Sequence, residues 1–195
     1  MSTQQNRTPL IIGVVVVVVL AGAMAFAMSS GDDYDGMLRV GSARSGEGDL
    51  GEIRATDAIP FGDVTVAGTP LPASQGGPDP AVGAVIPAVT GQDFARREMA
   101  IGADGRPKVI VFVAHWCPHC QAEVPVLTEH LEDGPPGEVD LYAVATATDP
   151  SRPNFPPALW LSEEGWPIDT MVDDATGSAA TAFGIGGFPY FIAVD

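Results

Sequence analysis

Cys117 and Cys120 are the two cysteines of this 195-residue chain, and they stand in the stretch AHWCPHCQAEVP. Two thiols at this spacing, in the first turn of a helix, lie within reach of a disulfide that can be exchanged with another protein. The free N–H groups and the positive end of the helix dipole favour a thiolate at Cys117. His119 adds to this effect when it is protonated. We therefore expect Cys117 to be the nucleophile and Cys120 to resolve the mixed disulfide.

Other uses of a cysteine pair fit the sequence less well. A structural zinc site usually needs four Cys or His ligands, and only His115 and His119, within the same few residues, could complete one. A c-type haem attachment requires histidine directly after the second cysteine, where Gln121 stands. A structural disulfide closing so small a loop would contribute little stability. A redox pair without a metal or another cofactor is the favoured interpretation.

The cysteines follow an apolar run of strand length, residues 108–114, which is typical of a central strand covered on both faces. Residues 118–132 are the expected helix, with Pro118 in its first turn and Pro125 inside it. Further elements alternate along the chain, which predicts a layered α/β domain. They are a hairpin over 82–107, strands over 137–147, 166–174 and 186–195, and helices over 156–165 and 176–184.

Residues 10–28 form an uninterrupted apolar run without a charge, long enough as a helix to cross a bilayer. Arg7 precedes this run and acidic residues follow it, so the positive-inside rule places residues 1–9 in the cytoplasm. A cleaved signal peptide is the alternative, because small residues alternate at Ala23, Ala25 and Ala27. In both cases the domain is expected outside the cytoplasm, where a disulfide can persist.

The segment between the apolar run and the domain, residues 29–78, is rich in Gly, Asp, Ser and Pro. This composition predicts a flexible extracytoplasmic tether, in which only DVTVAG has the alternation of a short strand. The folded domain is expected over residues 79–195. The formal charge of −16 argues against a nucleic-acid partner.

The segment VFVAHWCPHCQAEVPVL, followed 72 residues after Cys117 by Pro189 in GFPYFIAVD, resembles the thioredoxin fold. It is most similar to membrane-anchored, TlpA/ResA-like extracytoplasmic thiol-disulfide oxidoreductases. The resemblance implies a three-layer α/β/α domain in which Pro189 is a cis-proline facing the sulfurs. It also implies client proteins with thiols or disulfides and a membrane redox partner. The residues expected to line the client groove are Trp116, Pro118, Gly187 and Phe188.

Two features depart from the family pattern. Val111 stands where thioredoxins commonly carry a buried aspartate, so Glu123 is the remaining candidate for an internal carboxylate, while His130 is expected at the surface near the helix end. The sequence stops at Asp195, directly after the strand that carries Pro189. The last strand and helix of the fold are therefore expected to be missing, which would leave an open sheet edge and a marginally stable chain.

The direction of exchange has two interpretations. The Pro118–His119 dipeptide resembles that of DsbA-type oxidases, whereas TlpA/ResA-like architecture implies reduction, including that of apocytochrome c in cytochrome c biogenesis. Because local electrostatics set the redox poise, oxidation or isomerisation of clients is favoured. A non-catalytic peptide-binding module with a permanent disulfide is an alternative. A peroxidase is disfavoured, because the Thr/Ser-rich context of a peroxidatic cysteine is absent.

Overall fold

Strand β6, Lys108–Val113, is the central element of the domain and is buried on both faces. Its alternate residues enter two separate hydrophobic clusters, because successive side chains of a strand point to opposite faces. Val111 and Val113 join one cluster, and Ile110 and Phe112 join the other; each of the four is at most 2% exposed. The central strand expected from the apolar run is confirmed.

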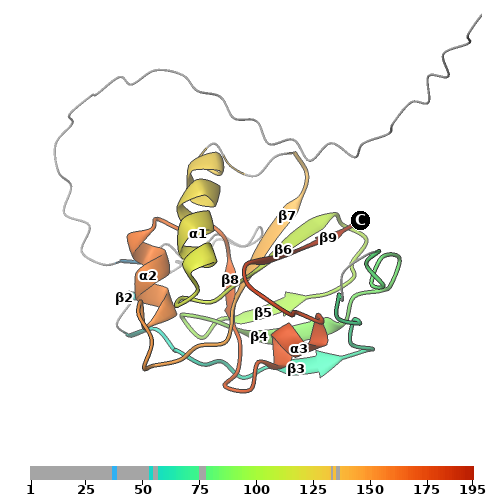
Figure 1. Cartoon of the computed structure of the whole chain (residues 1–195), viewed down its shortest axis with the longest axis horizontal. Coiled ribbons are helices and arrows are strands. Elements are labelled where there is room, and N and C mark those ends of the chain that lie inside the picture. Colours follow the sequence, from blue (N-terminus) through green and yellow to red (C-terminus); the bar gives the residue numbers. More distant parts are fainter. Residues whose placement is uncertain (1–36, 39–52, 55–56, 75–77, 133, 135–136) are drawn as a thin grey trace, which may run out of the picture. The chain divides into compact units, whose positions relative to one another are not determined.

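The described strands around β6 form a mixed sheet in the order β3-β4-β8-β7-β6-β9, with β5 also paired to β4 (Figure 1). Strands β6, β7 and β8 are parallel, whereas β4 and β9 run antiparallel to their neighbours. The strands are β3 Thr65–Ala67, β4 Ala88–Asp93, β5 Glu98–Ile101, β7 Asp140–Ala145, β8 Thr170–Val172 and β9 Tyr190–Val194; a separate short pair is β1 Met37–Leu38 with β2 Ile53–Arg54.

Helices cover both faces of this sheet. Helices α1, Pro118–His130, and α2, Pro157–Glu163, share one hydrophobic cluster with Val113, and Figure 1 shows them on the same side of the sheet. Helix α3, Ser178–Ala182, belongs to the other cluster with Phe112. The predicted three-layer α/β/α arrangement is therefore confirmed.

Helix α1 begins directly after Cys117, whose backbone is extended with φ −78° and ψ 120°. Pro118 occupies the first helical position, where the missing N–H needs no partner. Pro125 lies inside the helix, as expected. The helix ends at His130, two residues before the expected end at position 132. The backbone of Leu131 departs from helical geometry, with φ −101° and ψ 4°, although its N–H still donates to the carbonyls of Leu127 and Thr128.

The structure is a computed structural model, and it describes residues 37–38, 53–54, 57–74, 78–132, 134 and 137–195. The expected cytoplasmic tail, residues 1–9, the expected anchor, residues 10–28, and much of the expected tether lie outside these ranges. Within them, no helix combines the length and the apolarity that crossing a bilayer requires.

Residues 57–74, assigned above to the tether, belong to the folded domain. Strand β3 pairs antiparallel with β4, which confirms the short strand expected in DVTVAG. The N–H of Gly62 donates to the carbonyl of Asp173 at 3.1 Å, which ties the segment to the end of β8. The expected boundary at residue 79 is wrong here, because composition does not reveal a segment that is ordered by backbone pairing. Its most buried side chains are Ala58, Ile59 and Leu71, at most 9% exposed.

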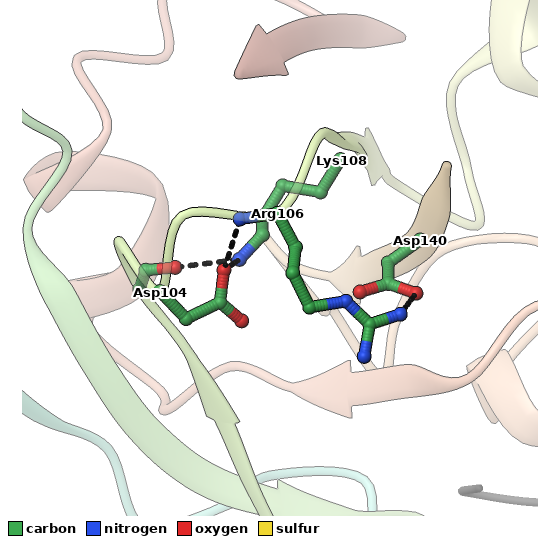
Figure 2. A network of polar contacts seen from close by, with 5 residues as sticks. Asp104, Arg106, Lys108 and Asp140 are labelled. Carbon is green, nitrogen blue, oxygen red and sulfur yellow. Dashed lines mark hydrogen bonds and ion pairs between the residues drawn. The ribbon is translucent and has the colours of Figure 1, made fainter. Parts of the chain in front are cut away.

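Ion pairs secure the amino-terminal ends of β6 and β7 (Figure 2). Lys108 is 2% exposed, and its ammonium donates to the carboxylate of Asp104 and to the carbonyl of Gly102. Arg106 donates to Asp140, the first residue of β7, at 2.6 Å. Because β6 and β7 are parallel, their carboxyl ends lie together at the opposite end of the strands. The cysteines follow the carboxyl end of β6.

Candidate active site

Cys117 lies where the carboxyl end of β6 passes into α1. Its N–H donates to the carbonyl of Ala114 at 3.0 Å, and its Sγ donates to the carbonyl oxygen of Phe188 at 3.4 Å. The Phe188–Pro189 peptide bond is cis, as the resemblance implied. Antiparallel pairing of β9 with β6 places Tyr190 opposite Phe112, and this pairing brings the segment before β9 to the thiol.

Cys120 lies deeper than Cys117. The structure holds both residues as free thiols, with Cys117 7% exposed and Cys120 fully buried. The N–H of Ala114 donates to the Cys120 sulfur at 3.4 Å. Burial raises the pKa of Cys120 to about 12; the Ala114 bond opposes this shift, and the charges of Cys117 and Glu123 add to it. Cys120 is therefore a protonated thiol at neutral pH, and Cys117 is the thiol nearer to solvent.

Trp116 packs against the hydrophobic cluster that contains both cysteines, and it also contacts the loop that joins β7 to α2. This loop, residues 146–156, is called here the β7–α2 loop. The indole N–H donates to the carbonyl of Ala147 at 2.7 Å. The ring meets Phe188 edge-on, with 6.4 Å between the ring centroids, and the Arg152 guanidinium lies 4.8 Å from the Trp116 centroid. The groove position predicted for Trp116 is thus beside the segment that contacts Cys117.

The buried side chain of His115 contacts the backbone of the same loop. The imidazole is 1% exposed, with Nδ1 2.6 Å from the carbonyl oxygen of Pro153 and Nε2 accepting the N–H of Asp149 at 3.1 Å. These contacts assign the proton of the neutral ring to Nδ1. Burial lowers the pKa of His115, against opposing contributions from the Pro153 carbonyl and the Asp149 charge. Sequence reasoning considered His115 only as a metal ligand; a polar residue at the end of a buried run was the available signal.

The other predicted site residues differ in how they are placed. Pro118, His119 and Gly187 are exposed, and no hydrogen bond or ion pair joins the His119 side chain to another residue in the described part of the chain. A Cβ added at Gly186 or Gly187 would meet nothing within 4 Å, so the approach to Phe188 is open on that side.

Val111, Glu123 and His130, which the sequence analysis singled out near the thiols and at the helix end, lie as follows. Val111 is buried in the cluster that contains both cysteines, so this strand supplies no charge beneath the thiols. Glu123 is half-buried and close enough to raise the pKa of Cys120 by its charge, after the larger effect of burial. His130 is exposed at the end of α1, where its Nδ1 lies 2.8 Å from the carbonyl oxygen of Val126.

A metal site at the thiols has no support in the geometry. Within residues 57–74, 78–132 and 137–195, no three His, Cys, Asp or Glu side chains gather as a metal ion would require. His115, which could have joined the thiols as a ligand, directs both ring nitrogens to backbone groups of the β7–α2 loop.

The chain is similar to known thiol-disulfide proteins. "Thiol:disulfide interchange protein DsbE" of Pseudomonas aeruginosa is 32% identical over 104 residues, which cover 53% of each chain. The chain thus spans about half the length of this curated relative. A solved thioredoxin domain of a Bacteroides vulgatus thiol-disulfide oxidoreductase is 23% identical, with a TM-score of 0.45 over 58% of this chain and 80% of that one. A secreted Mycobacterium tuberculosis disulfide oxidoreductase homologous to E. coli DsbE is 22% identical, with a TM-score of 0.43 over 53% and 73% of the two chains.

One family model covers well over half of the sequence, including β4 to β9 and both cysteines. It is the Redoxin model, which matches residues 68–195, and the chain therefore belongs to the Redoxin family.

Proposed function

We propose that this protein is a thiol-disulfide oxidoreductase that exchanges disulfides with client proteins through Cys117 and Cys120. The observation that carries the proposal is the contact between the Cys117 thiol and the Phe188 carbonyl at the start of α1. It joins a thiol at a helix N-terminus to an exposed backbone segment, beside which an extended client can lie. The DsbE-named relative supports the same chemistry at the level of the reaction.

The exchange proceeds in two balanced steps. The Cys117 thiolate attacks one sulfur of a client disulfide, which forms a mixed disulfide and releases the other client sulfur as a thiolate that takes up a proton. Cys120 then loses its proton and attacks the Cys117 sulfur, which releases the second client thiol. The client gains two electrons and two protons, and the protein is left with a Cys117–Cys120 disulfide. Client oxidation follows the same steps in reverse.

Oxidation or isomerisation is the direction we favour. Cys120 attacks only as a thiolate, and its pKa of about 12 keeps that form rare at neutral pH. Val111 supplies no buried carboxylate to accept the proton. A mixed disulfide at Cys117 that is resolved slowly gives another client thiol time to attack, and this leads to isomerisation.

Client reduction is the second candidate, with apocytochrome c as the client class that the resemblance implies. It is favoured by Glu123, a half-buried carboxylate whose charge acts on Cys120. A carboxylate in that place could accept the Cys120 proton and speed the resolving step. Turnover in this direction requires a dithiol donor, the role expected of a membrane redox partner.

The proposed place of work is outside the cytoplasm, with residues 10–28 as a membrane anchor. Support comes from the sequence, where the apolar run is preceded by Arg7 and followed by acidic residues. A disulfide-exchanging site suits an oxidising compartment.

The test compares two clients, a scrambled multi-disulfide protein and a correctly paired one in the presence of excess dithiol. Recovery of native pairing of the scrambled client supports isomerisation, whereas faster reduction of the paired client supports the reductase. Cys117→Ser should abolish both activities. Full activity of Cys117→Ser would show that Cys117 is not the nucleophile, and no activity of the unmodified chain on either client would leave the non-catalytic binding module.

A further inference from the structure

The β7–α2 loop is attached to the redox site at two points, although it contributes no thiol. The carbonyl of Ala147 accepts the Trp116 indole N–H at 2.7 Å, and Arg152 lies over the Trp116 ring at 4.8 Å. Trp116 in turn meets Phe188, whose carbonyl accepts the Cys117 thiol. A continuous series of contacts therefore leads from the reactive sulfur to the guanidinium of Arg152.

The buried imidazole of His115 fixes the position of this loop. Its two ring nitrogens contact the backbone of Pro153 and Asp149, on either side of Arg152. The His115 carbonyl also accepts the side-chain amide of Asn154 at 3.2 Å. Because the loop backbone is held on both sides of Arg152, its guanidinium is kept over the ring of Trp116.

Arg152 retains hydrogen-bonding capacity that the protein does not use. Its side chain is 54% exposed, and its one ion pair joins Nε to Asp149 at 3.6 Å. No acceptor contacts its terminal amino groups among the residues that the structure describes. The other Asp149 oxygen accepts the N–H and hydroxyl of Ser151, so that carboxylate is anchored within the loop. The free end of the guanidinium can therefore donate to a group that arrives from solvent.

Arg152 is a positive charge beside the redox site of a strongly acidic chain. The chain carries a formal charge of −16, which repels acidic clients at long range. Arg106 and Lys108 lie at the opposite edge of the sheet, at the amino ends of β6 and β7. Arg96 lies at that edge as well, because it follows β4, which runs antiparallel to β8.

We propose that Arg152, held over Trp116, is a subsite that binds an acidic side chain next to the reactive cysteine of a client. A carboxylate fits the planar donor fork of a guanidinium, and the indole face holds that fork in place. The subsite rests on the proposed function, since it names the class of client that the exchange site accepts. It predicts preference for client segments with Glu or Asp beside the cysteine.

The binding test uses redox-inert, dye-labelled peptides of one sequence, in which serine replaces the cysteine and the adjacent residue is Glu, Gln or Lys. Fluorescence anisotropy measures their affinity for the full chain. The Glu peptide should bind about three- to fivefold more tightly than the Gln peptide, and the Lys peptide should bind most weakly. The difference should shrink as salt is added, because the charge is exposed.

Variants assign this preference to one residue. Arg152→Gln should bring the Glu to Gln affinity ratio to about one, Arg152→Lys should keep part of the preference, and Arg152→Glu should favour the Lys peptide. Arg96→Gln removes the same charge as Arg152→Gln, but at the end of the strands opposite to the thiols. It should leave the affinities in the order Glu, Gln, Lys peptide. Equal binding of the Glu and Gln peptides to the unmodified chain, no binding of any peptide, or a preference that survives in Arg152→Gln would overturn the proposal.

Cystine forms of the same peptides, supplied with excess dithiol, separate this proposal from the proposed function. If the Glu preference in binding holds while no peptide exchanges its disulfide, the subsite stands and the oxidoreductase proposal fails. If all the peptides are exchanged at equal rates and bind equally, the oxidoreductase stands and the subsite is wrong.

Discussion

The Cys117 thiol lies 3.4 Å from the backbone carbonyl oxygen of Phe188, although the two residues are 71 positions apart in the sequence. This contact is possible because β9 pairs antiparallel with β6, so the segment entering β9 meets the segment leaving β6. One edge of the sheet thus presents both a thiol and the backbone beside which a client can lie.

The two cysteines should behave differently when each is replaced. Cys117→Ser removes the more accessible thiol and should abolish exchange, whereas Cys120→Ser leaves a nucleophile without its resolving partner. Cys120→Ser should therefore accumulate a mixed disulfide with a client, measured as an added mass that a reductant removes. Accumulation of such an adduct in Cys117→Ser instead would reverse the assigned roles.

The Cys120 thiol should titrate far above an ordinary cysteine. In Cys117→Ser the charge of Cys117 is lost but burial, the main cause of the shift, is kept. In a pH titration, the thiolate absorbance of Cys120 should therefore appear only at pH values well above about 8.5, the approximate pKa of an ordinary cysteine. In the unmodified protein, where the pKa of Cys120 is about 12, resolution of the mixed disulfide should speed up about tenfold per pH unit around neutrality. A Cys120 titration near that of a free thiol would contradict the role of burial.

His115 should make the domain less stable in mild acid. Its pKa is lowered by burial in the folded state, so the unfolded chain binds more protons once the pH falls below about 6.5, the ordinary histidine value. The free energy of unfolding should therefore decrease as the pH is lowered from about 6.5 through the lowered folded-state pKa of His115. Urea melts at several pH values measure this slope.

A matched variant isolates the contribution of His115. His115→Gln should lose about 1–3 kcal/mol at neutral pH, because buried partners in the β7–α2 loop lose a hydrogen bond. It should also show a flatter pH dependence than the unmodified chain, since it lacks the imidazole whose pKa is lowered by burial in the folded state. An identical slope in the two proteins would show that His115 does not titrate differently on folding.

Gly62 should be intolerant of a side chain. A Cβ at this position would lie 2.3 Å from the carbonyl oxygen of Val172 in β8, which is backbone and cannot rotate away. Gly62→Ala should cost about 1–3 kcal/mol of unfolding free energy in a urea melt. Gly186→Ala, where a Cβ meets nothing within 4 Å, is the control and should change stability by less than about 0.5 kcal/mol. Equal melts for the two variants would mean that residues 57–74 do not pack against β8.

The sequence predicted those parts of the fold that have strong local signals. The apolar run of β6 and the helix start after Cys117 are local patterns, and the order of strands and helices followed from them. The position of Phe188 beside Cys117 came from a resemblance rather than from spacing. Local signals were sufficient for the central layers and for the thiols.

Contacts made by loops could not be predicted in the same way. Trp116 binds the carbonyl of Ala147, and a backbone carbonyl is offered by every residue type. The stacking of Arg152 on Trp116 depends on where the β7–α2 loop is held, which His115 decides through backbone groups. The fold before residue 79 was missed for a related reason, since β3 is short and Gly62 contributes only its backbone.

Lys108 is the single lysine of the chain, and its ammonium is enclosed at the start of β6. Amine acylation of the folded domain should therefore be slow at this residue, because the amino end of β6 must open first. The rate at which Lys108 is acylated becomes an intrinsic probe of that opening, at the end of β6 opposite to the thiols. Peptide mass mapping after timed acylation would read it without adding any label to the protein.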